Sequence, residues 1–281
     1  MNYQELWRQL VHVYDDGEAK AIARMVYEKR FGLTLSDIYL GKDTQLSAND
    51  QAELAEIVQR LLQQEPVQYV IGETDFCGRT LMVNPHVLIP RPETEELCRW
   101  IIAEAGNGNV QTNDILDIGT GSGCIAITLA ASLPDAHLSA WDISGEALQV
   151  ADENAKRHHV HVSFSQVDVL HVPGTMGKGP YDLIVSNPPY ICHKERLTMA
   201  PNVLAHEPHT ALFVPDDDPL LFYRAIARYG QTALREGGSL YFEINPLYAT
   251  SLAQLFCSMS YHDIEIHTDE YGKQRMISAK R

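Results

Sequence analysis

The sequence is short of cysteine and of basic residues, and each shortage excludes a class of protein. Its five cysteines are odd in number and widely spaced, and they form no C-x-x-C pair. This pattern argues against a disulfide scaffold or a cysteine zinc site and fits a reducing cytoplasm. Lys and Arg total 22 against 37 Asp and Glu, which gives a net charge of −15. A surface this acidic repels nucleic acid at long range and does not attract anionic lipid, so we expect no direct nucleic-acid or membrane partner.

Long apolar runs, internal repeats and low-complexity tracts are also missing. No uninterrupted apolar stretch approaches the roughly 20 residues that a membrane-spanning helix needs. Residues 1–5 do not combine a basic start with an apolar core, so we expect no signal peptide. The 281 residues are 45% hydrophobic and 21% charged, a composition typical of a globular protein with about two domains. We therefore expect a soluble, cytoplasmic protein.

Residues 1–65 carry apolar residues at helical spacing in three segments. The third opens at Ser47, a favourable N-cap residue with Asp50 three positions later, and Pro66 ends the run. Short helices are marginally stable alone, so the pattern predicts a small helical bundle. The apolar residues at this spacing are Tyr3, Leu6, Trp7, Leu10, Val11, Ile22, Ala23, Val26, Tyr27, Leu54, Ile57, Val58 and Leu61.

The period of the sequence changes to two after this bundle. From Val67 to Val83, β-branched and aromatic residues surround the turn-forming Gly72 and Gly78, which predicts a β-hairpin or paired strands. Prolines then predict a stiff connector without regular helix. These prolines are Pro85, Pro90 and Pro92. We therefore expect a linker over residues 66–92.

Strands and helices alternate from residue 93 to residue 281. Parallel strands need crossover connections, so the alternation predicts a mostly parallel, doubly wound α/β sheet with helices on both faces. Ligands in such sheets bind at the carboxyl ends of the strands, near the point where the strand order reverses. The expected strands span residues 114–118, 137–143, 162–167, 181–186, 239–244, 262–267 and 275–279, and the last two form an antiparallel hairpin. The expected helices span residues 94–104, 124–133, 144–158, 219–235 and 246–260.

A glycine-rich turn follows the first expected strand. Residues 117–123 read Asp-Ile-Gly-Thr-Gly-Ser-Gly, and glycines there let the backbone approach a ligand closely. The spacing is G-x-G-x-G rather than the G-x-G-x-x-G of dinucleotide-binding folds. Taken alone, the loop is also compatible with a tight turn that binds nothing.

Two acidic residues follow the next two strands. Asp142 lies about 20 residues after the loop, where a carboxylate can accept both ribose hydroxyls, and Ser144 is available to cap the following helix. Asp168 is placed to accept from the exocyclic amine of adenine, although it is equally compatible with being a loop carboxylate that binds no ligand. The loop has no Lys and no G-K-[ST] sequence to hold phosphate. The pocket therefore favours S-adenosylmethionine over ATP, because acidic groups tolerate a sulfonium cation.

The strand over residues 181–186 ends in Asn187-Pro188-Pro189-Tyr190, the tetrad. Two prolines fix the backbone, so the Asn187 side-chain oxygen and the Pro188 carbonyl can converge on one NH2 group. Tyr190 offers an aromatic face for a planar target. An amide nitrogen is a poor nucleophile because its lone pair is delocalised. Two acceptors can orient that lone pair and stabilise the charge that methyl transfer creates. The alternative interpretation of the tetrad is a proline-rich turn that only closes the strand.

Twelve histidines raise the question of a metal site. No carboxylate or cysteine joins the histidines around residues 158–161 at ligand spacing. The sequence His206-Glu207-Pro208-His209 contains a proline, so it is not the helical H-E-x-x-H zinc motif. We expect no metal.

Three motifs together resemble the peptide chain release factor N(5)-glutamine methyltransferase family, which is part of the class I S-adenosylmethionine-dependent methyltransferases. They are the glycine loop at residues 117–123, the tetrad, and the sequence Val-Leu-Ile-Pro-Arg-Pro-Glu-Thr-Glu at residues 87–95. The third motif is the most specific, because the other two occur in other amino-methylating enzymes. The resemblance covers nearly the whole chain. It implies a seven-stranded methyltransferase sheet in a domain of residues 93–281, with a helical-bundle domain joined by a β-hairpin linker.

The resemblance also implies an activity: methylation of the glutamine side-chain amide in the Gly-Gly-Gln loop of class I release factors. We expect residues 1–65 to help to dock this substrate, and we expect the protein to be a monomer. Asn187, Pro188 and Tyr190 are the implied catalytic residues, and Pro189 joins them in binding the substrate. Arg91 is either an ordinary surface residue or a neighbour of the methionine end of the cofactor. The expected cofactor-binding residues are Asp117, Gly119, Thr120, Gly121, Asp142, Asp168 and Asn187.

Three alternative functions stay open on the sequence alone. A glutamine methyltransferase for a ribosomal protein shares the tetrad, although the sequence Arg91-Pro92-Glu93-Thr94 favours a release factor. An amino-methylating nucleic-acid methyltransferase needs base flipping and a basic groove, which the charge of −15 opposes. A non-catalytic module that keeps only the nucleoside pocket is opposed by the intact tetrad.

Overall fold

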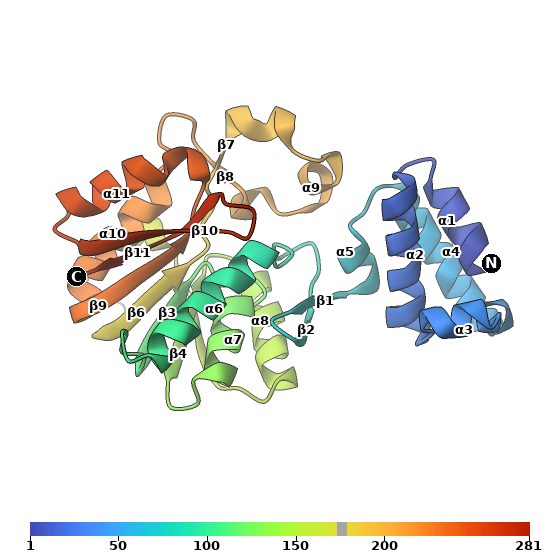
Figure 1. Ribbon diagram of the computed structural model, residues 1–281, viewed down its shortest axis with the longest axis horizontal. Coiled ribbons are helices and arrows are strands. Elements are labelled where there is room, and N and C mark those ends of the chain that lie inside the picture. The colour runs from blue at the N-terminus through green and yellow to red at the C-terminus, as the bar shows by residue number, and fades with distance from the viewer. Residues whose placement is uncertain (173–178) are drawn as a thin grey trace. The chain divides into compact units, whose positions relative to one another are not determined.

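The computed structural model describes residues 1–172 and 179–281, which divide into two compact units (Figure 1). The helical unit comprises Met1–Glu73 and Met199–His206, and the sheet unit comprises Thr74–Thr198 and Glu207–Arg281. These limits differ from the predicted 1–65, 66–92 and 93–281, because most of the linker joins the sheet unit and a segment beyond the tetrad joins the helices. Within the helical unit, His206 Nε2 lies 3.3 Å from the Gln63 carbonyl oxygen.

The helical unit packs around one apolar core, as its spacing predicts. Ser47 Oγ accepts a hydrogen bond from the Asp50 amide, and the Asp50 carboxylate accepts one from the Ser47 amide, which confirms the predicted cap. The core residues Leu6, Leu10, Val26, Leu54 and Leu61 are fully buried. The helices are α1 (Tyr3–Leu10), α2 (Asp16–Phe31), α3 (Leu35–Tyr39), η1 (Lys42–Gln45), α4 (Ala48–Leu62), α5 (Val67–Ile71) and α9 (Pro201–His206).

The prediction of strand over residues 67–71 is wrong, because α5 is a helix there. It begins after Pro66 and ends at Gly72, whose φ of 87° is the left-handed conformation typical of a helix C-terminus. The Arg60 guanidinium donates to the Tyr69 carbonyl at 3.1 Å, which satisfies a free helix-end acceptor. Five residues are too few to separate a period of two from a period of 3.6.

The hairpin itself is present but shorter than predicted. It consists of β1 (Glu73–Phe76) and β2 (Arg79–Met82), joined by Cys77 and Gly78. Both turn residues have positive φ, 47° and 72°, as a two-residue type I′ turn requires. Asn154 fastens the hairpin to the sheet unit, because its side chain exchanges hydrogen bonds with the Met82 backbone at 2.7 and 2.9 Å and also donates to the Ser122 carbonyl.

Seven strands form the central sheet in the order β10-β11-β9-β6-β3-β4-β5. The five strands from β9 to β5 are parallel neighbours, and β11 runs antiparallel to β9 and β10, which confirms the predicted doubly wound, mostly parallel sheet. The chain runs outward from β3 to β5 and then returns to β6 on the other side of β3. The strand order therefore reverses between β3 and β6, where α/β sheets bind ligands. The strands are β3 (Asp114–Ile118), β4 (His137–Asp142), β5 (Val162–Gln166), β6 (Tyr181–Ser186), β9 (Leu234–Glu243), β10 (His262–Thr268) and β11 (Gln274–Lys280).

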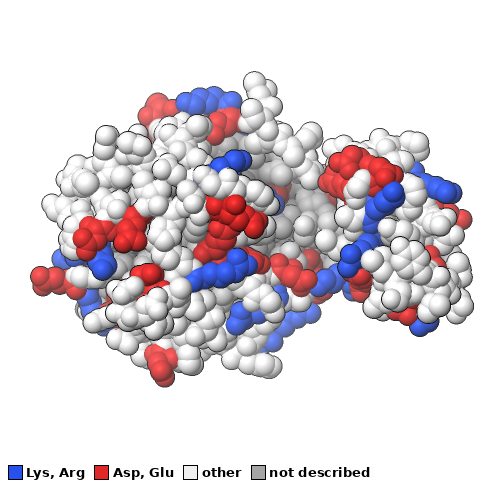
Figure 2. Space-filling model, in the orientation of Figure 1, with Lys and Arg blue, Asp and Glu red and all other residues white. Residues whose placement is uncertain are grey.

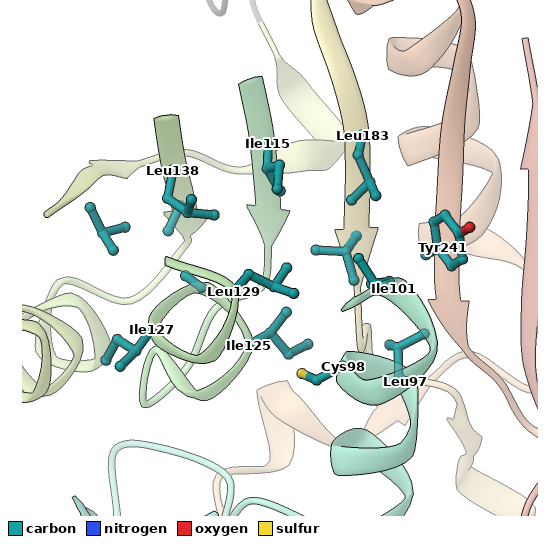
Figure 3. Close-up of a cluster of buried hydrophobic side chains, with 14 of the residues drawn as sticks. Leu97, Cys98, Ile101, Ile115, Ile125, Ile127, Leu129, Leu138, Leu183 and Tyr241 are labelled. Atoms are coloured by element: carbon teal, nitrogen blue, oxygen red, sulfur yellow. The ribbon is translucent and has the colours of Figure 1, made fainter. Parts of the chain in front are cut away.

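Helices cover both faces of this sheet (Figure 1). On one face, Figure 3 shows Leu97 and Ile101 of α6 and Leu129 of α7 pointing toward strand residues such as Ile115 and Leu183. A second core of equal extent covers the opposite face and includes α10 and α11. The helices are α6 (Pro92–Gly106), α7 (Cys124–Ser132), α8 (Gly145–Arg157), α10 (Leu221–Ala233) and α11 (Ala249–Ser258).

Short elements that the periodicity did not predict surround the carboxyl edge of the sheet. Pairing of Ile191 with Phe213 and of Cys192 with Val214 places the stretch after the tetrad beside a later loop. No helix among the described residues is long and apolar enough to cross a membrane. The short elements are η2 (Val169–His171), β7 (Ile191–Cys192), η3 (His193–Thr198), η4 (His209–Ala211), β8 (Phe213–Val214) and η5 (Pro246–Tyr248).

Candidate active site

A cavity of about 350 Å³ opens at the carboxyl ends of β3, β4 and β6 in the sheet unit. This volume is in the range of small-molecule sites. Its position follows from the reversal of strand order, because the loops after β3 and β6 diverge there and leave a crevice. The glycine loop, Asp142, Asp168 and the first three tetrad residues all line it, so the structure brings together most of the residues that the sequence singled out.

The glycine loop presents its backbone to this cavity. A Cβ added at Gly121 would meet no atom within 4 Å, so the backbone there borders open space that a ligand can fill. Gly123 has the opposite surroundings: its φ is 81°, and an added Cβ would lie 2.9 Å from Ile127 Cδ1. A Cβ at Gly119 would lie 4.0 Å from the Asn187 carbonyl oxygen. The loop therefore passes directly beside the tetrad.

Asp142 ends β4 with its carboxylate in the cavity wall. Its Oδ2 accepts from the Gly121 amide at 2.8 Å, and its Oδ1 accepts from the Ser144 amide at 2.9 Å. Ser144 Oγ accepts from the Ala147 amide at 3.1 Å, so Ser144 caps α8 as predicted and Asp142 does not. Burial raises the pKa of Asp142, against the hydrogen bonds that stabilise its ionised form. The carboxylate is thus both a brace for the glycine loop and an acceptor facing the cavity.

Asp117 lies behind the loop and does not line the cavity. Its fully buried Oδ2 accepts from Thr120 Oγ1 at 2.6 Å and from the Ala126 amide at 3.2 Å. Among the described residues, Oδ1 has no hydrogen-bond partner. Burial raises the pKa of Asp117 to about 7. Its place in the structure is that of a brace for the start of α7, and a direct cofactor contact stays a prediction.

The raised pKa of Asp117 predicts a pH dependence of stability. The folded chain keeps this proton up to about pH 7, whereas an unfolded aspartate loses it near 3.8. Between these values the folded state binds more protons, so the free energy of unfolding falls as the pH rises. Urea unfolding across this range should show the fall in the wild type and a flatter profile in Asp117→Asn. Parallel profiles for the two proteins would contradict the assignment.

Asp168 lines the cavity, but its carboxylate also makes hydrogen bonds within its own turn. Its carboxylate accepts from the Leu170 amide at 2.9 Å and pairs with His171 Nδ1 at 2.7 Å. Burial acts to raise the pKa of Asp168, but these hydrogen bonds outweigh it and the pKa is lowered. Two apolar cavity residues, Ile143 and Leu170, leave 57% and 36% of their surface exposed. They provide exposed apolar surface in the same cavity as the Asp168 carboxylate.

The tetrad stands at the end of β6, beside the glycine loop. Asn187, Pro188 and Pro189 line the cavity. Asn187 Nδ2 donates to Thr94 Oγ1 at 3.1 Å, which leaves the side-chain oxygen of Asn187 free of that bond. Pro188 is buried and has no N–H, so the turn presents acceptors rather than donors.

Tyr190 differs from the expectation, because it is not among the residues that line the cavity. Its ring packs against the second core, and its hydroxyl donates to Glu243 Oε1 at 2.8 Å. Burial raises the pKa of Tyr190, and the neighbouring Glu243 carboxylate raises it further. Packing of the target amide against this ring therefore stays a prediction.

Several residues near the site were missed by sequence reasoning. Glu243 is 1% exposed at the end of β9, and Asn245 donates to the Tyr190 carbonyl at 3.3 Å and to the Glu195 carboxylate. One signal could have found Glu243: it is an acidic residue inside the apolar strand sequence Ser-Leu-Tyr-Phe-Glu-Ile. A buried carboxylate requires polar partners, and sequence alone does not say which.

Arg91 is part of the cavity wall and forms an ion pair with Glu207 in the loop after the tetrad. Its guanidinium donates to Glu207 Oε1 at 2.5 Å, and the Ile89 amide donates to Glu207 Oε2 at 3.3 Å. The Glu207 side chain is 1% exposed, so the ion pair is shielded on the carboxylate side. Arg91 and Pro208 both line the cavity, and the pair therefore fixes two segments of its rim.

Within residues 1–172 and 179–281, no three His, Cys, Asp or Glu side chains are grouped so that they could hold a metal. On the face that Figure 2 shows, Lys and Arg side chains are interspersed with Asp and Glu.

Comparison with known proteins decides the family. The model of the methyltransferase small domain matches residues 101–212, and that of the PrmC N-terminal domain matches residues 5–72. A release factor glutamine methyltransferase of Bacteroides thetaiotaomicron is 47% identical over 274 residues, which make up 98% of this chain and 97% of the relative. The chain belongs to the release factor glutamine methyltransferase family. A member from Streptococcus pneumoniae is 38% identical, with 93% of this chain and 91% of the relative covered.

Solved structures share the methyltransferase fold at low sequence identity. A methyltransferase from Pyrococcus furiosus aligns with a TM-score of 0.52 at 15% identity and covers 83% of this chain and 98% of its own. A 16S rRNA methyltransferase from Thermus thermophilus, solved in complex with AdoMet and guanosine, aligns with a TM-score of 0.54 at 16% identity over 74% of this chain and 49% of its own. These likenesses show the fold of the sheet unit.

Proposed function

We propose that this methyltransferase transfers a methyl group from S-adenosylmethionine to the side-chain amide nitrogen of the glutamine in the Gly-Gly-Gln loop of a class I peptide chain release factor. The observation that carries the proposal is the adjacency of the glycine loop and the tetrad at the strand-order reversal, in a chain that matches curated release factor glutamine methyltransferases over nearly its full length. The substrate is a translation factor, so we place the reaction in the cytoplasm and propose that the enzyme acts as a monomer.

Several residues that line the cavity support S-adenosylmethionine as its ligand. Asp142 is placed to accept the ribose hydroxyls, and the open backbone at Gly119–Gly121 permits the close approach that the ligand needs. Asp168, with Ile143 and Leu170 nearby, is placed for the adenine ring. When bound, this cofactor supplies an electrophilic methyl group on a sulfonium centre. Thr120 and Asn187 complete the proposed binding set, and Asp117 supports it from behind.

The tetrad performs the positioning that amide methylation requires. Asn187 Oδ1 and the Pro188 carbonyl accept the two hydrogens of the glutamine NH2, which holds the nitrogen in one orientation. The same two acceptors stabilise the positive charge that develops on the nitrogen as the new bond forms. The nitrogen proton becomes acidic only after methyl transfer, so no strong base has to act first. Pro189 shapes the bend, and Tyr190 supports it from the core side.

Mass spectrometry of the product tests this function. The purified enzyme is incubated with isotope-labelled S-adenosylmethionine and a class I release factor, and the modified residue is mapped. We expect one methyl group on the amide of the Gly-Gly-Gln glutamine and none on a release factor with glutamate at that position. Label found on a ribosomal protein under the same conditions, and not on the release factor, would instead support the alternative substrate.

We further propose that the helical unit helps to dock the release factor. Tyr39 and Leu40 leave 87% and 75% of their surface exposed at the end of α3, an arrangement suited to an apolar contact. The double variant Tyr39→Ser, Leu40→Ser should raise the KM for the release factor several-fold and leave kcat unchanged. Tyr271→Ser, which alters a 79% exposed side chain on the sheet unit, is the matched control. An unchanged KM in the double variant would contradict docking at this end of the unit.

A further inference from the structure

Four side chains from α6, β9 and the tetrad form one hydrogen-bond network, in which Thr94 and Asn187 line the cavity while Tyr190 and Glu243 lie behind it. Thr94 Oγ1 donates to Glu243 Oε2 at 2.5 Å, and the Tyr190 hydroxyl donates to Glu243 Oε1 at 2.8 Å. Asn187 Nδ2 donates to Thr94 Oγ1 at 3.1 Å. Thr94 is 2% exposed and Glu243 is 1% exposed, so solvent does not compete for these bonds.

The direction of each bond follows from the chemistry of Glu243. Burial raises the pKa of Glu243, although the hydrogen bonds from Thr94 and Tyr190 act against that rise. In its ionised form the carboxylate can only accept, and both hydroxyl groups that contact it donate to it. A hydroxyl has a single hydrogen, and Thr94 uses it on Glu243. The remaining lone pairs of Thr94 Oγ1 can only accept, and the group that reaches them is therefore the NH2 of Asn187 rather than its oxygen. The network thus selects one of the two orientations of the Asn187 amide.

This selection matters because the two ends of an Asn amide have opposite roles. With its NH2 group directed to Thr94, Asn187 presents its oxygen as the acceptor for a substrate NH2. The flipped amide would present two donors to a group that is itself a donor, and would repel it. Sequence alone does not distinguish these orientations.

We propose that Thr94 and Glu243 are positioning residues, which hold the Asn187 side chain in the orientation that accepts the substrate amide. The inference rests on the proposed glutamine methyltransferase function. Glu243 does not line the cavity and is bound to two hydroxyls, so it acts through Thr94 and Asn187 rather than as a base on the substrate. Thr94 is the link, because it contacts both the carboxylate and the Asn187 amide.

Substitution of Thr94 tests the link with little change in shape. Thr94→Val replaces the hydroxyl with a methyl group and removes the acceptor, so Asn187 is no longer held in one orientation. We expect kcat for release-factor methylation, measured at saturating S-adenosylmethionine, to fall roughly tenfold, as for the loss of one buried hydrogen bond. Thr94→Ser restores the hydroxyl and should recover most of kcat. Thr128→Val, at a 2% exposed threonine of α7 outside the cavity wall, is the matched control.

A double-mutant cycle separates positioning from ordinary structural support. If Thr94 acts through Asn187, Thr94→Val should cost little further activity in an Asn187→Ala background. Equal losses in both backgrounds would overturn the inference. The wild type is measured in the same assay. A wild type that does not methylate the glutamine would contradict the proposed function. An active wild type together with a fully active Thr94→Val variant would contradict the positioning role alone.

Discussion

Replacing Asn187 with alanine is expected to lower kcat for release-factor methylation by roughly 10²–10³-fold, the usual effect of deleting one preorganised polar contact from a site of developing charge. The backbone carbonyl of Asn187 lies beside the glycine loop, and its side-chain NH2 group donates to Thr94. We propose that its side-chain oxygen accepts from the substrate. The variant loses this acceptor, whereas the Pro188 carbonyl and the cofactor cavity remain. Steady-state assays with saturating S-adenosylmethionine measure the effect.

Asn109→Ala is the matched control for this variant, because Asn109 is an exposed asparagine of the same unit with its side chain bonded to Glu104. It should retain full turnover. An Asn187→Ala enzyme within about threefold of the wild type in kcat would show that the tetrad does not orient the amide in the way proposed.

Replacing Asp142 with alanine is expected to weaken the binding of S-adenosylmethionine by about 10- to 100-fold, in line with the loss of charge-assisted hydrogen bonds. Asp142 supplies the acceptor proposed for the ribose and also holds the Gly121 amide at 2.8 Å, so the variant loses a ligand contact and a brace of the loop together. Isothermal titration calorimetry gives the dissociation constant directly.

Asp135→Ala removes the same charge from an exposed site in the turn before β4 and should leave that dissociation constant unchanged. An Asp142→Ala protein that binds the cofactor as tightly as the wild type would exclude Asp142 from the cofactor site. Loss of affinity in both variants would instead indicate a general effect of net charge.

The parts of the fold that sequence predicts best are the buried parallel strands. The limits of β3 and β6 match the prediction, because each is a short apolar run bounded by a turn and covered on both faces. The segment over residues 67–71 was predicted as strand, because five residues ending in glycine fit a helix C-terminus and a turn equally well. The local pattern of apolar residues predicts the type of secondary structure where an element is long or buried on both faces, and it is ambiguous for other segments.

The structure brings together the main residues of the predicted site, whereas sequence reasoning missed the residues that support them. The glycine loop and the tetrad lie next to a strand end, so topology alone brings them together. Thr94 and Glu243 are 149 positions apart, and their contact depends on how α6 packs over β9. The hydrogen-bond partner of a buried carboxylate depends on three-dimensional packing, so it cannot be predicted from residue spacing.

A crystal structure with S-adenosylhomocysteine and a peptide containing Gly-Gly-Gln would test the central claim most directly. We predict that the glutamine side-chain nitrogen lies at hydrogen-bonding distance, about 2.7–3.2 Å, from both Asn187 Oδ1 and the Pro188 carbonyl oxygen, beside the cofactor sulfur. A peptide glutamine bound elsewhere, or an Asn187 side chain that turns its NH2 group toward it, would contradict the account.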